Sequence, residues 1–275
     1  MAARTKKSHE LMKHGVVWFV LFFAFLPLYI MLVISLKDNA QFVRNPWFPF
    51  PPFHWENWVY GWRLVNNYIA NSILVSTLAV IATLITALLS AFVFARYDFP
   101  GKTLLWYLLL GLLFMPGIMN LVPLFILMRN LHLLNSLIGL IALYAVGGQV
   151  FCVFVLRNFI EDLPNELFEA AQVDGAGPIQ QVFTIVVPLS GSILATLAIL
   201  RFLGCWNNFI QPLIFIADDY KQLIPVGLMR LDGEYVKQWG RMMAGFTIAA
   251  IPLVLIFLFT MRLFVRGLTA GAVKG

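Results

Sequence analysis

Charged residues are scarce in this chain. Asp, Glu, Lys and Arg make up 12% of the 275 residues, whereas roughly 25% of the residues of an ordinary soluble domain are charged. Hydrophobic residues make up 61%, so there is too little polar surface to cover a water-soluble globule. The composition excludes a soluble domain and predicts an integral membrane protein.

Cysteine pairs, metal-ligand clusters and phosphate-binding loops are also lacking. Cys152 and Cys205 fall inside apolar runs, so the sequence has no disulfide framework and no CxxC pair. It has no Gly-x-x-x-x-Gly-Lys-Ser/Thr loop for a nucleotide, and no partner stands at ligand spacing from His132. We therefore expect no metal and no cofactor in this chain. The net charge of +6 is spread over the ends of apolar runs, a pattern that argues against nucleic-acid binding.

Long runs without charge are what the sequence has in abundance. Each is long enough to cross a hydrocarbon core, which takes roughly 20 helical residues. Because a β-barrel would show short alternating segments, the runs predict an all-α membrane protein with six transmembrane helices. They cover residues 16–36, 68–95, 103–128, 136–156 and 242–261, and a sixth block, residues 182–216, contains the single charge Arg201.

Basic residues before the first run indicate the orientation. Arg4, Lys6, Lys7 and Lys13 face only one acid there, Glu10, and cytoplasmic segments carry the excess of Lys and Arg. The run that follows is too long for a signal peptide and has no small-residue cleavage site. We expect a cytoplasmic tail over residues 1–15, a transmembrane region over 16–265 and a second cytoplasmic tail over 266–275.

The loop of residues 157–188 departs from that charge rule because it is acidic. Its apolar residues recur at helical spacing, and the helix should stop at Gly175, since glycine accepts a left-handed conformation. A second short helix, residues 179–186, leads into the next span. This helix-turn-helix is a shape for docking on another protein; the alternative is a solvated connecting loop. Its acids are Glu161, Asp162, Glu166, Glu169 and Asp174, and its apolar stripe is Leu163, Leu167, Ala170, Ala171 and Val173.

At this loop the sequence resembles the inner-membrane permeases of binding-protein-dependent ABC importers. Their signature reads Glu-Ala-Ala, three residues, Gly, nine residues, Ile, any residue, Leu-Pro. It appears here as Glu169-Ala170-Ala171, Gly175, Ile185 and Val187-Pro188, with Val187 in place of leucine. The stretch from Asp174 to Ala176, Phe183 and the tail of residues 264–275 resemble the carbohydrate-uptake branch, in its maltose-permease-like half.

The resemblance implies a type I ABC importer permease fold and a set of partners. These are a homologous second permease, two cytoplasmic ATPase subunits that bind ATP and Mg, an extracytoplasmic solute-binding protein and a sugar. Hydrolysis would occur on the ATPase subunits, so the chain is not expected to be an enzyme. It would lie in the inner or plasma membrane of a prokaryote with both termini cytoplasmic. The resemblance also implies a coupling helix, with Glu169, Ala170, Ala171, Asp174, Gly175, Ile185 and Pro188 as coupling residues.

Polar residues inside the spans point to a substrate pathway, because such groups usually face the bundle interior or a water-filled cavity. On a helix, Cys205 and Asn208 share the face of Arg201, and Trp206 and Asn207 lie to either side. An arginine, two amides and an indole would suit a sugar, and the arginine would suit an anionic one such as a uronate oligomer. Alternatively, Arg201 pairs with an acid or a helix-terminal carbonyl of the second permease.

Asn120 is the other polar residue of the predicted pathway. It stands between Pro116 and Pro123, where prolines free backbone carbonyls in a kinked helix. A kink that serves only helix packing is the alternative interpretation.

Two broader alternatives remain. The chain could be an ABC permease for another solute, such as amino acids or peptides, because the Glu-Ala-Ala signature is shared more widely than the sugar-branch features. It could also be a membrane enzyme or a structural subunit of an energy-converting complex. An enzyme would need convergent acids, histidines or a metal cluster, and the one acid cluster of the sequence has the pattern of a docking helix.

Overall fold

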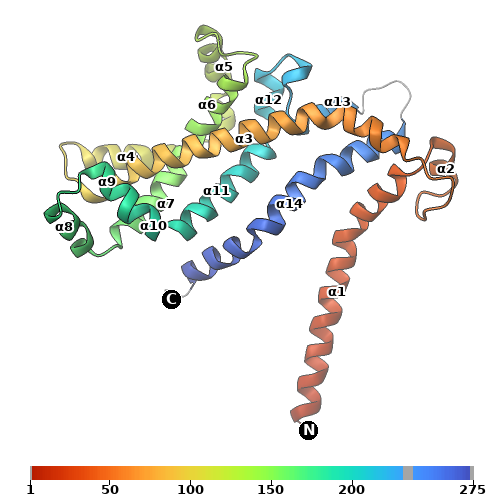
Figure 1. The fold of residues 1–275 in the computed structure, drawn as a ribbon, viewed down its shortest axis with the longest axis horizontal. Helices are drawn as coiled ribbons and strands as arrows, with labels where there is room; N and C mark the ends of the chain where they lie inside the picture. The colour runs from red at the N-terminus through yellow and green to blue at the C-terminus, as the bar shows by residue number, and fades with distance from the viewer. Residues whose placement is uncertain (1, 232–237, 273–275) are drawn as a thin grey trace. The chain divides into compact units, whose positions relative to one another are not determined.

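A computed structural model describes residues 2–231 and 238–272, and all its regular elements within these ranges are helices (Figure 1). They form two compact units. Unit 1 comprises Met1–Asn67 and Gly227–Val254, and unit 2 comprises Tyr68–Val226 and Leu255–Gly275. The predicted all-α class is confirmed.

The helices follow in chain order, and α1 and α14 extend beyond the predicted spans. Residues 2–15 and 266–272, expected as tails, are helical, and residues 1 and 273–275 lie outside the described ranges. The elements are α1 (Ala2–Ser35), α2 (Asn39–Arg44), α3 (Glu56–Arg96), α4 (Lys102–Leu112), η1 (Gly117–Asn120), α5 (Leu121–Asn130), α6 (Leu137–Gly147), α7 (Gln149–Glu161), α8 (Asn165–Val173), α9 (Pro178–Gln181), the π-helical η2 (Val182–Val186), α10 (Val187–Leu189), α11 (Gly191–Trp206), α12 (Ile210–Phe215), η3 (Asp219–Lys221), α13 (Ile224–Leu231) and α14 (Trp239–Ala272).

Within the described ranges, three helices are long and apolar enough to cross a membrane singly: Met12–Ser35, Glu56–Arg96 and Trp239–Leu258. Three further pairs qualify as bent spans. Lys102–Leu112 meets Gly117–Asn130 at 97°, Leu137–Gly147 meets Gln149–Glu161 at 43°, and Pro178–Leu189 meets Gly191–Trp206 at 84°. Counting each pair as one span gives up to six, in agreement with the predicted number.

The bends lie inside the predicted runs of residues 103–128, 136–156 and 182–216, and the sequence predicts a kink only in the first of these, beside Asn120. The first bend falls just before Pro116, whose ring lacks the N–H that a continuing helix needs. The second falls at Gly148. The third falls at Ser190 and lies inside the predicted block of residues 182–216, which continues as α11 from Gly191 to Trp206.

Unit 1 is built around a close approach of α3 to α14. A methyl group on Gly61 would lie 2.8 Å from the backbone nitrogen of Gly245 and 3.2 Å from the Ala244 side chain. Small residues allow such contact between membrane helices. By contrast, most of α1 has no other helix of the unit beside it (Figure 1), and 11% of its apolar segment is buried.

Lys37 organises the segment between α1 and α3. Its side chain is 1% exposed and donates from Nζ to the carbonyls of Asn45 and Phe48, the latter at 2.8 Å. The ammonium also lies 4.9 Å from the Phe50 ring centroid. Burial lowers the pKa of Lys37, because desolvation disfavours the charged form, and the two carbonyls offset part of that cost.

The larger core of unit 2 joins α3, α7, α8, η2 and α11. Its buried side chains come from helices far apart in sequence. Within unit 2, α4, α8 and α9 lie together at one end, away from α5 and α12 (Figure 1). The core therefore supports the loop that carries the acidic signature. Its members are Ala87, Leu88, Ala91, Phe92, Cys152, Val153, Leu156, Ile160, Phe168, Val182, Val186 and Leu197.

The packing in unit 1 predicts the effect of one added methyl group. Gly61→Ala should destabilise the protein by about 1–3 kcal/mol, because the new methyl overlaps the α14 backbone. Gly111→Ala is the matched control, since nothing lies within 4 Å of its added methyl. Thermal unfolding of the purified protein in detergent measures both. A Gly61→Ala midpoint at or above that of Gly111→Ala would contradict the close approach.

Candidate functional site

The acidic loop of unit 2 folds as a helical hairpin. Helix α8 ends in a Schellman turn, in which Gly175 has a φ of +79°. The Ala176 N–H donates to Ala171 O at 2.8 Å, and the Gly175 N–H donates to Gln172 O at 3.0 Å. Only glycine accepts this conformation readily, so Gly175 sets the direction in which the chain leaves α8.

One residue attaches the face of α8 to the core. Phe168 is 5% exposed, whereas Leu167 is 42% and Val173 is 88% exposed. Of the residues in the predicted apolar stripe, Leu163 packs against the core, whereas Leu167, Ala170 and Val173 are exposed and Ala171 is half-buried. A helix this short contacts the core at one point, so sequence spacing alone did not identify its inner face.

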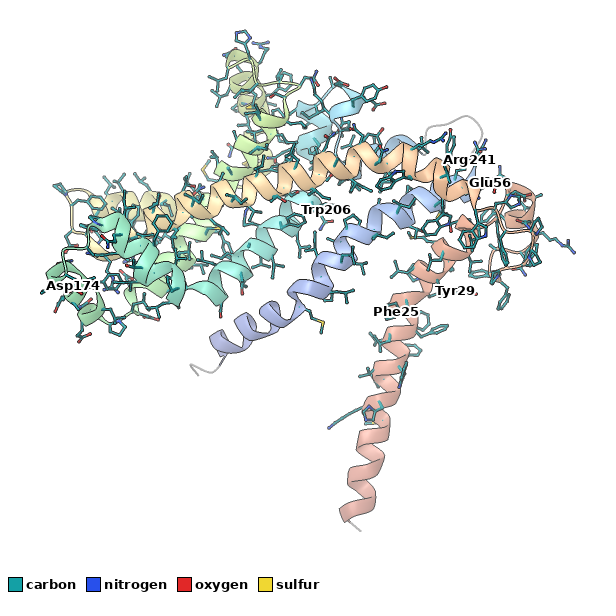
Figure 2. All side chains as sticks on the ribbon, viewed as in Figure 1. Phe25, Tyr29, Glu56, Asp174, Trp206 and Arg241 are labelled. Carbon is teal, nitrogen blue, oxygen red and sulfur yellow. The ribbon has the colours of Figure 1, made fainter. Side chains whose placement is uncertain are left out.

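The outward face of the hairpin combines acids with apolar surface. Glu166, Glu169 and Asp174 are exposed, and Figure 2 shows Asp174 at the α8 end of the unit. Phe183 on η2 is exposed as well. Of the other predicted coupling residues, Ile185 is half-buried against the core and Pro188 is exposed. This surface is suited to a partner with basic and apolar groups.

A small polar cavity of about 140 Å³ brings Arg201, Cys205 and Asn208 together, as the helical spacing predicted. Arg201 donates from Nη2 to the Tyr144 carbonyl at 2.9 Å. That carbonyl belongs to the last turn of α6 and precedes the bend at Gly148. Arg201 thus has a helix-terminal carbonyl of its own chain as a partner, and the alternative of an acid or carbonyl on a second permease stays a prediction.

The guanidinium of Arg201 packs directly on Gly148. A methyl group there would overlap Nε, Cζ and Nη2, and Nε is buried with no hydrogen-bond partner among the described residues. Arg201 thus fills the notch that the missing side chain leaves at the bend between α6 and α7.

A second, larger cavity of about 420 Å³ lies between the loop before α12 and the bend before α5. Asn207 and Asn208 line it, and the Asn208 Oδ1 accepts from the Gln211 N–H at 3.0 Å. The end of α11 and the bend before α5 therefore meet at one cavity, to which Asn207, Asn208 and Gln211 contribute polar groups. Its lining residues are Gly117, Ile118, Leu121, Asn207, Asn208, Phe209, Ile210 and Gln211.

Two predicted pathway residues lie outside both cavities. Trp206 is buried at the end of α11 (Figure 2) and stacks on Phe202 with ring centroids 5.5 Å apart, so its indole lines neither cavity. Asn120 is exposed in η1 and lies next to the cavity residue Leu121. Gln211 and Gly117 also line the larger cavity but were not predicted, because Gln211 lies on α12, beyond the end of α11, and Gly117 lies in η1, far away in sequence.

Metal chemistry finds no support in the described part of the chain. No group of three or more His, Cys, Asp and Glu side chains there could hold a metal ion.

The fold and the hairpin define a polytopic permease, and comparisons with known proteins identify its family. The profile of the binding-protein-dependent transport system inner membrane component matches residues 75–270. The chain belongs to this family, which confirms the resemblance drawn from the Glu-Ala-Ala signature.

Several curated relatives match along most of their length. A probable ABC transporter permease of Bacillus subtilis is 33% identical, with 94% of this chain and 88% of the relative covered. The diacetylchitobiose uptake system permease of Streptomyces coelicolor is 30% identical over 97% and 88%. The trehalose/maltose transport system permease of Thermococcus litoralis is 32% identical over 89% and 90%.

A solved structure has the same fold. It is a chain of a bacterial ABC transporter involved in the import of the acidic polysaccharide alginate, with a TM-score of 0.84, and 94% of this chain and 97% of that chain are covered. At 18% identity the likeness concerns the fold, and it confirms the predicted importer-permease architecture.

The notch at Gly148 predicts a coupled pair of substitutions. Gly148→Ala should cost about 1–3 kcal/mol with Arg201 present, and this cost should largely vanish in an Arg201→Ala background, because the methyl then meets no guanidinium. Gly147→Ala, with nothing within 4 Å of its methyl, is the control. Thermal unfolding midpoints of the four variants of the cycle give the coupling energy. Equal costs in both backgrounds would refute the packing of Arg201 on Gly148.

Proposed function

We propose that this chain is the permease subunit of an ATP-driven, binding-protein-dependent importer of sugars or oligosaccharides. Family membership supports the importer. The sugar is supported by relatives at 30–33% identity whose substrates are diacetylchitobiose, arabinooligosaccharides and trehalose or maltose. The observation that carries the mechanism is the exposed, acidic α8–α9 hairpin on the core of unit 2.

In this proposal α8 is the coupling helix, and it docks on a separate ATPase subunit. Glu169 and Asp174 offer acceptors to basic or amide donors, and Ala170 and Ala171 allow close approach. Gly175 fixes the angle between α8 and α9, while Ile185 and Pro188 connect the hairpin to the following span. Closure of two ATPase subunits that hold ATP and Mg then moves the membrane helices as rigid bodies.

The assembly requires further partners and one orientation. A homologous second permease completes the pathway, and an extracytoplasmic solute-binding protein delivers the sugar. The hairpin and both termini face the cytoplasm of a prokaryotic cell, in line with the basic residues that precede the first span. In this proposal the chain contributes part of the translocation pathway and the coupling helix α8, and ATP is hydrolysed on the ATPase subunits.

The larger cavity, between the loop before α12 and the bend before α5, is the proposed sugar contact of this subunit. Asn207 and Asn208 present amides there, and an amide can both donate to and accept from sugar hydroxyls. Asn120 lies at its edge, and Trp206 supports it from the packing behind. Arg201, in the adjoining cavity, would favour an anionic sugar, because a guanidinium donates charge-assisted hydrogen bonds to a carboxylate.

Reconstitution tests the proposed function. The complex with its ATPase, second permease and binding protein is placed in proteoliposomes and given maltose, trehalose, diacetylchitobiose, arabinose oligomers, alginate oligomers, amino acids and peptides in turn. We expect at least one sugar to stimulate ATP hydrolysis and to enter the vesicles. Stimulation only by amino acids or peptides would leave an importer of another solute, and no ATPase bound to the complex would remove the importer itself.

Substitutions in the hairpin test its role as the coupling helix. Glu169→Lys and Gly175→Val should abolish uptake while the protein remains in the membrane, because one reverses a docking charge and the other forces a β-branched residue into a φ of +79°. Gly177→Val is the matched control, since Gly177 has a φ of −70° and nothing within 4 Å of an added methyl. Wild-type uptake by both hairpin variants would contradict the assignment.

Arg201→Met tests the charge of the substrate. If the sugar is anionic, uptake of alginate oligomers should fall about tenfold or more, as expected for a lost charge-assisted hydrogen bond. Uptake of maltose should stay near the wild-type rate. Transport of neutral sugars alone, undiminished by the substitution, would assign Arg201 to the bend between α6 and α7 only.

A further inference from the structure

A single arginine ties the proposed coupling helix to the longest membrane helix. Arg96, the last residue of α3, donates from Nη2 to the carbonyls of Ile160 and Leu163, the latter at 2.7 Å, and from Nη1 to Asn165 Oδ1. Its guanidinium carbon lies 4.0 Å from the centroid of the Phe168 ring. These contacts span more than sixty residues of sequence and all lie within unit 2.

The acceptors mark the two ends of the joint before α8. The Ile160 carbonyl belongs to the last turn of α7, where carbonyls lack helical donors and carry partial negative charge. Asn165 is the first residue of α8. The planar guanidinium presents several donors in a fixed fork, so one side chain holds the end of α7, the turn and the start of α8 in one geometry.

Little else holds α8. Phe168 is its one buried side chain, and its ring lies between Arg96 and Phe92, with the Phe92 and Phe168 centroids 6.2 Å apart. Ala171 is half-buried, and the other residues of α8 form an exposed surface. A force on that surface can therefore reach the membrane helices through the Phe168 contact and the Arg96 fork, or be absorbed by movement of the joint.

We propose that Arg96 is the positioning residue that makes α8 move rigidly with α3, so that closure of the ATPase is converted into movement of the membrane helices. This inference rests on the proposed function, in which α8 contacts the ATPase. Without the fork, α8 still docks, but the joint bends and hydrolysis proceeds with little transport.

Arg157 provides a matched control within the same region. Its guanidinium carbon also stacks on an aromatic ring, 4.3 Å from the Trp106 centroid, and it also pairs locally, with Glu161 one turn away on α7. Its hydrogen-bond partners, Asn158 and Glu161, both lie on α7. Loss of Arg157 removes a stacked arginine and a charge without removing a bond to α8.

The experiment compares Arg96→Met, Arg96→Lys and Arg157→Met in the full complex, reconstituted with ATPase, second permease and binding protein. Crosslinking of an Ala171→Cys variant to the ATPase reports docking of α8. Spin labels at Val173 on α8 and Val93 on α3, both exposed, report the distance across the joint with and without Mg-ATP and vanadate; Cys152 and Cys205 are buried and do not compete for label. Transport per ATP is measured with the most stimulating compound of the panel described above.

We expect Arg96→Met to keep the crosslink, to broaden the distance distribution and to lower transport per ATP by about tenfold, within the range known for coupling mutations. Arg96→Lys keeps the charge but not the fork of donors, and should show the same changes to a smaller degree. If the Arg96→Met variant does not assemble, Arg96→Lys alone tests the positioning role. Arg157→Met should match the wild type.

Two results have distinct meanings. A retained crosslink with a narrow distance distribution and wild-type transport per ATP in the Arg96 variants would overturn the positioning role and leave the proposed function intact. If the Ala171→Cys variant with Arg96 and Arg157 unchanged does not crosslink to an ATPase, the proposed function is overturned, and the inference with it.

Discussion

A backbone carbonyl that leaves its helix inside a membrane has no water to bond, so the protein must supply the donor. Three of the spans bend sharply in this chain, and each bend creates that demand. At the bend between α6 and α7, Arg201 donates to Tyr144 O, and Gln149 donates to Ala145 O at 3.1 Å. At the bend before α11, the Ser190 hydroxyl donates to Val186 O. Arg201, Gln149 and Ser190 thus donate to backbone carbonyls at two of the three bends.

The same bends create the space in which transport chemistry can take place. The larger cavity lies where the break before α5 meets the end of α11, and the smaller one lies beside the Arg201 contact. Asn208 and Gln211 line both. Irregular backbone is tolerated at membrane depth where it lines a cavity or is buried in protein, so the polar cavities and the broken helices are two results of one arrangement.

Sequence reasoning reached the all-α class, the apolar runs and the hairpin with its turn at Gly175, because long apolar periodicity and glycine chemistry are local signals. It did not reach the size of the bends, which depend on tertiary partners such as Arg201 on another helix. It also placed Trp206 in the pathway, because helical spacing sets this residue beside the face of Arg201, whereas its ring packs on Phe202. Phe168 was missed as the inner residue of α8, since a helix of 9 residues has too few turns for periodicity to identify its buried side.

The contacts of Arg96 also bear on how such permeases can be recombined. A segment of residues 157–188 looks like a self-contained cassette, with its own helices, turn and signature. However, Arg96, which holds this segment, is the last residue of α3, and Phe92, an aromatic neighbour of Phe168, lies on that same helix. In a chimera that exchanges residues 157–188 between transporters, the exchanged segment packs on helix α3 of the recipient. A compatible exchange therefore also transfers residues 92 and 96.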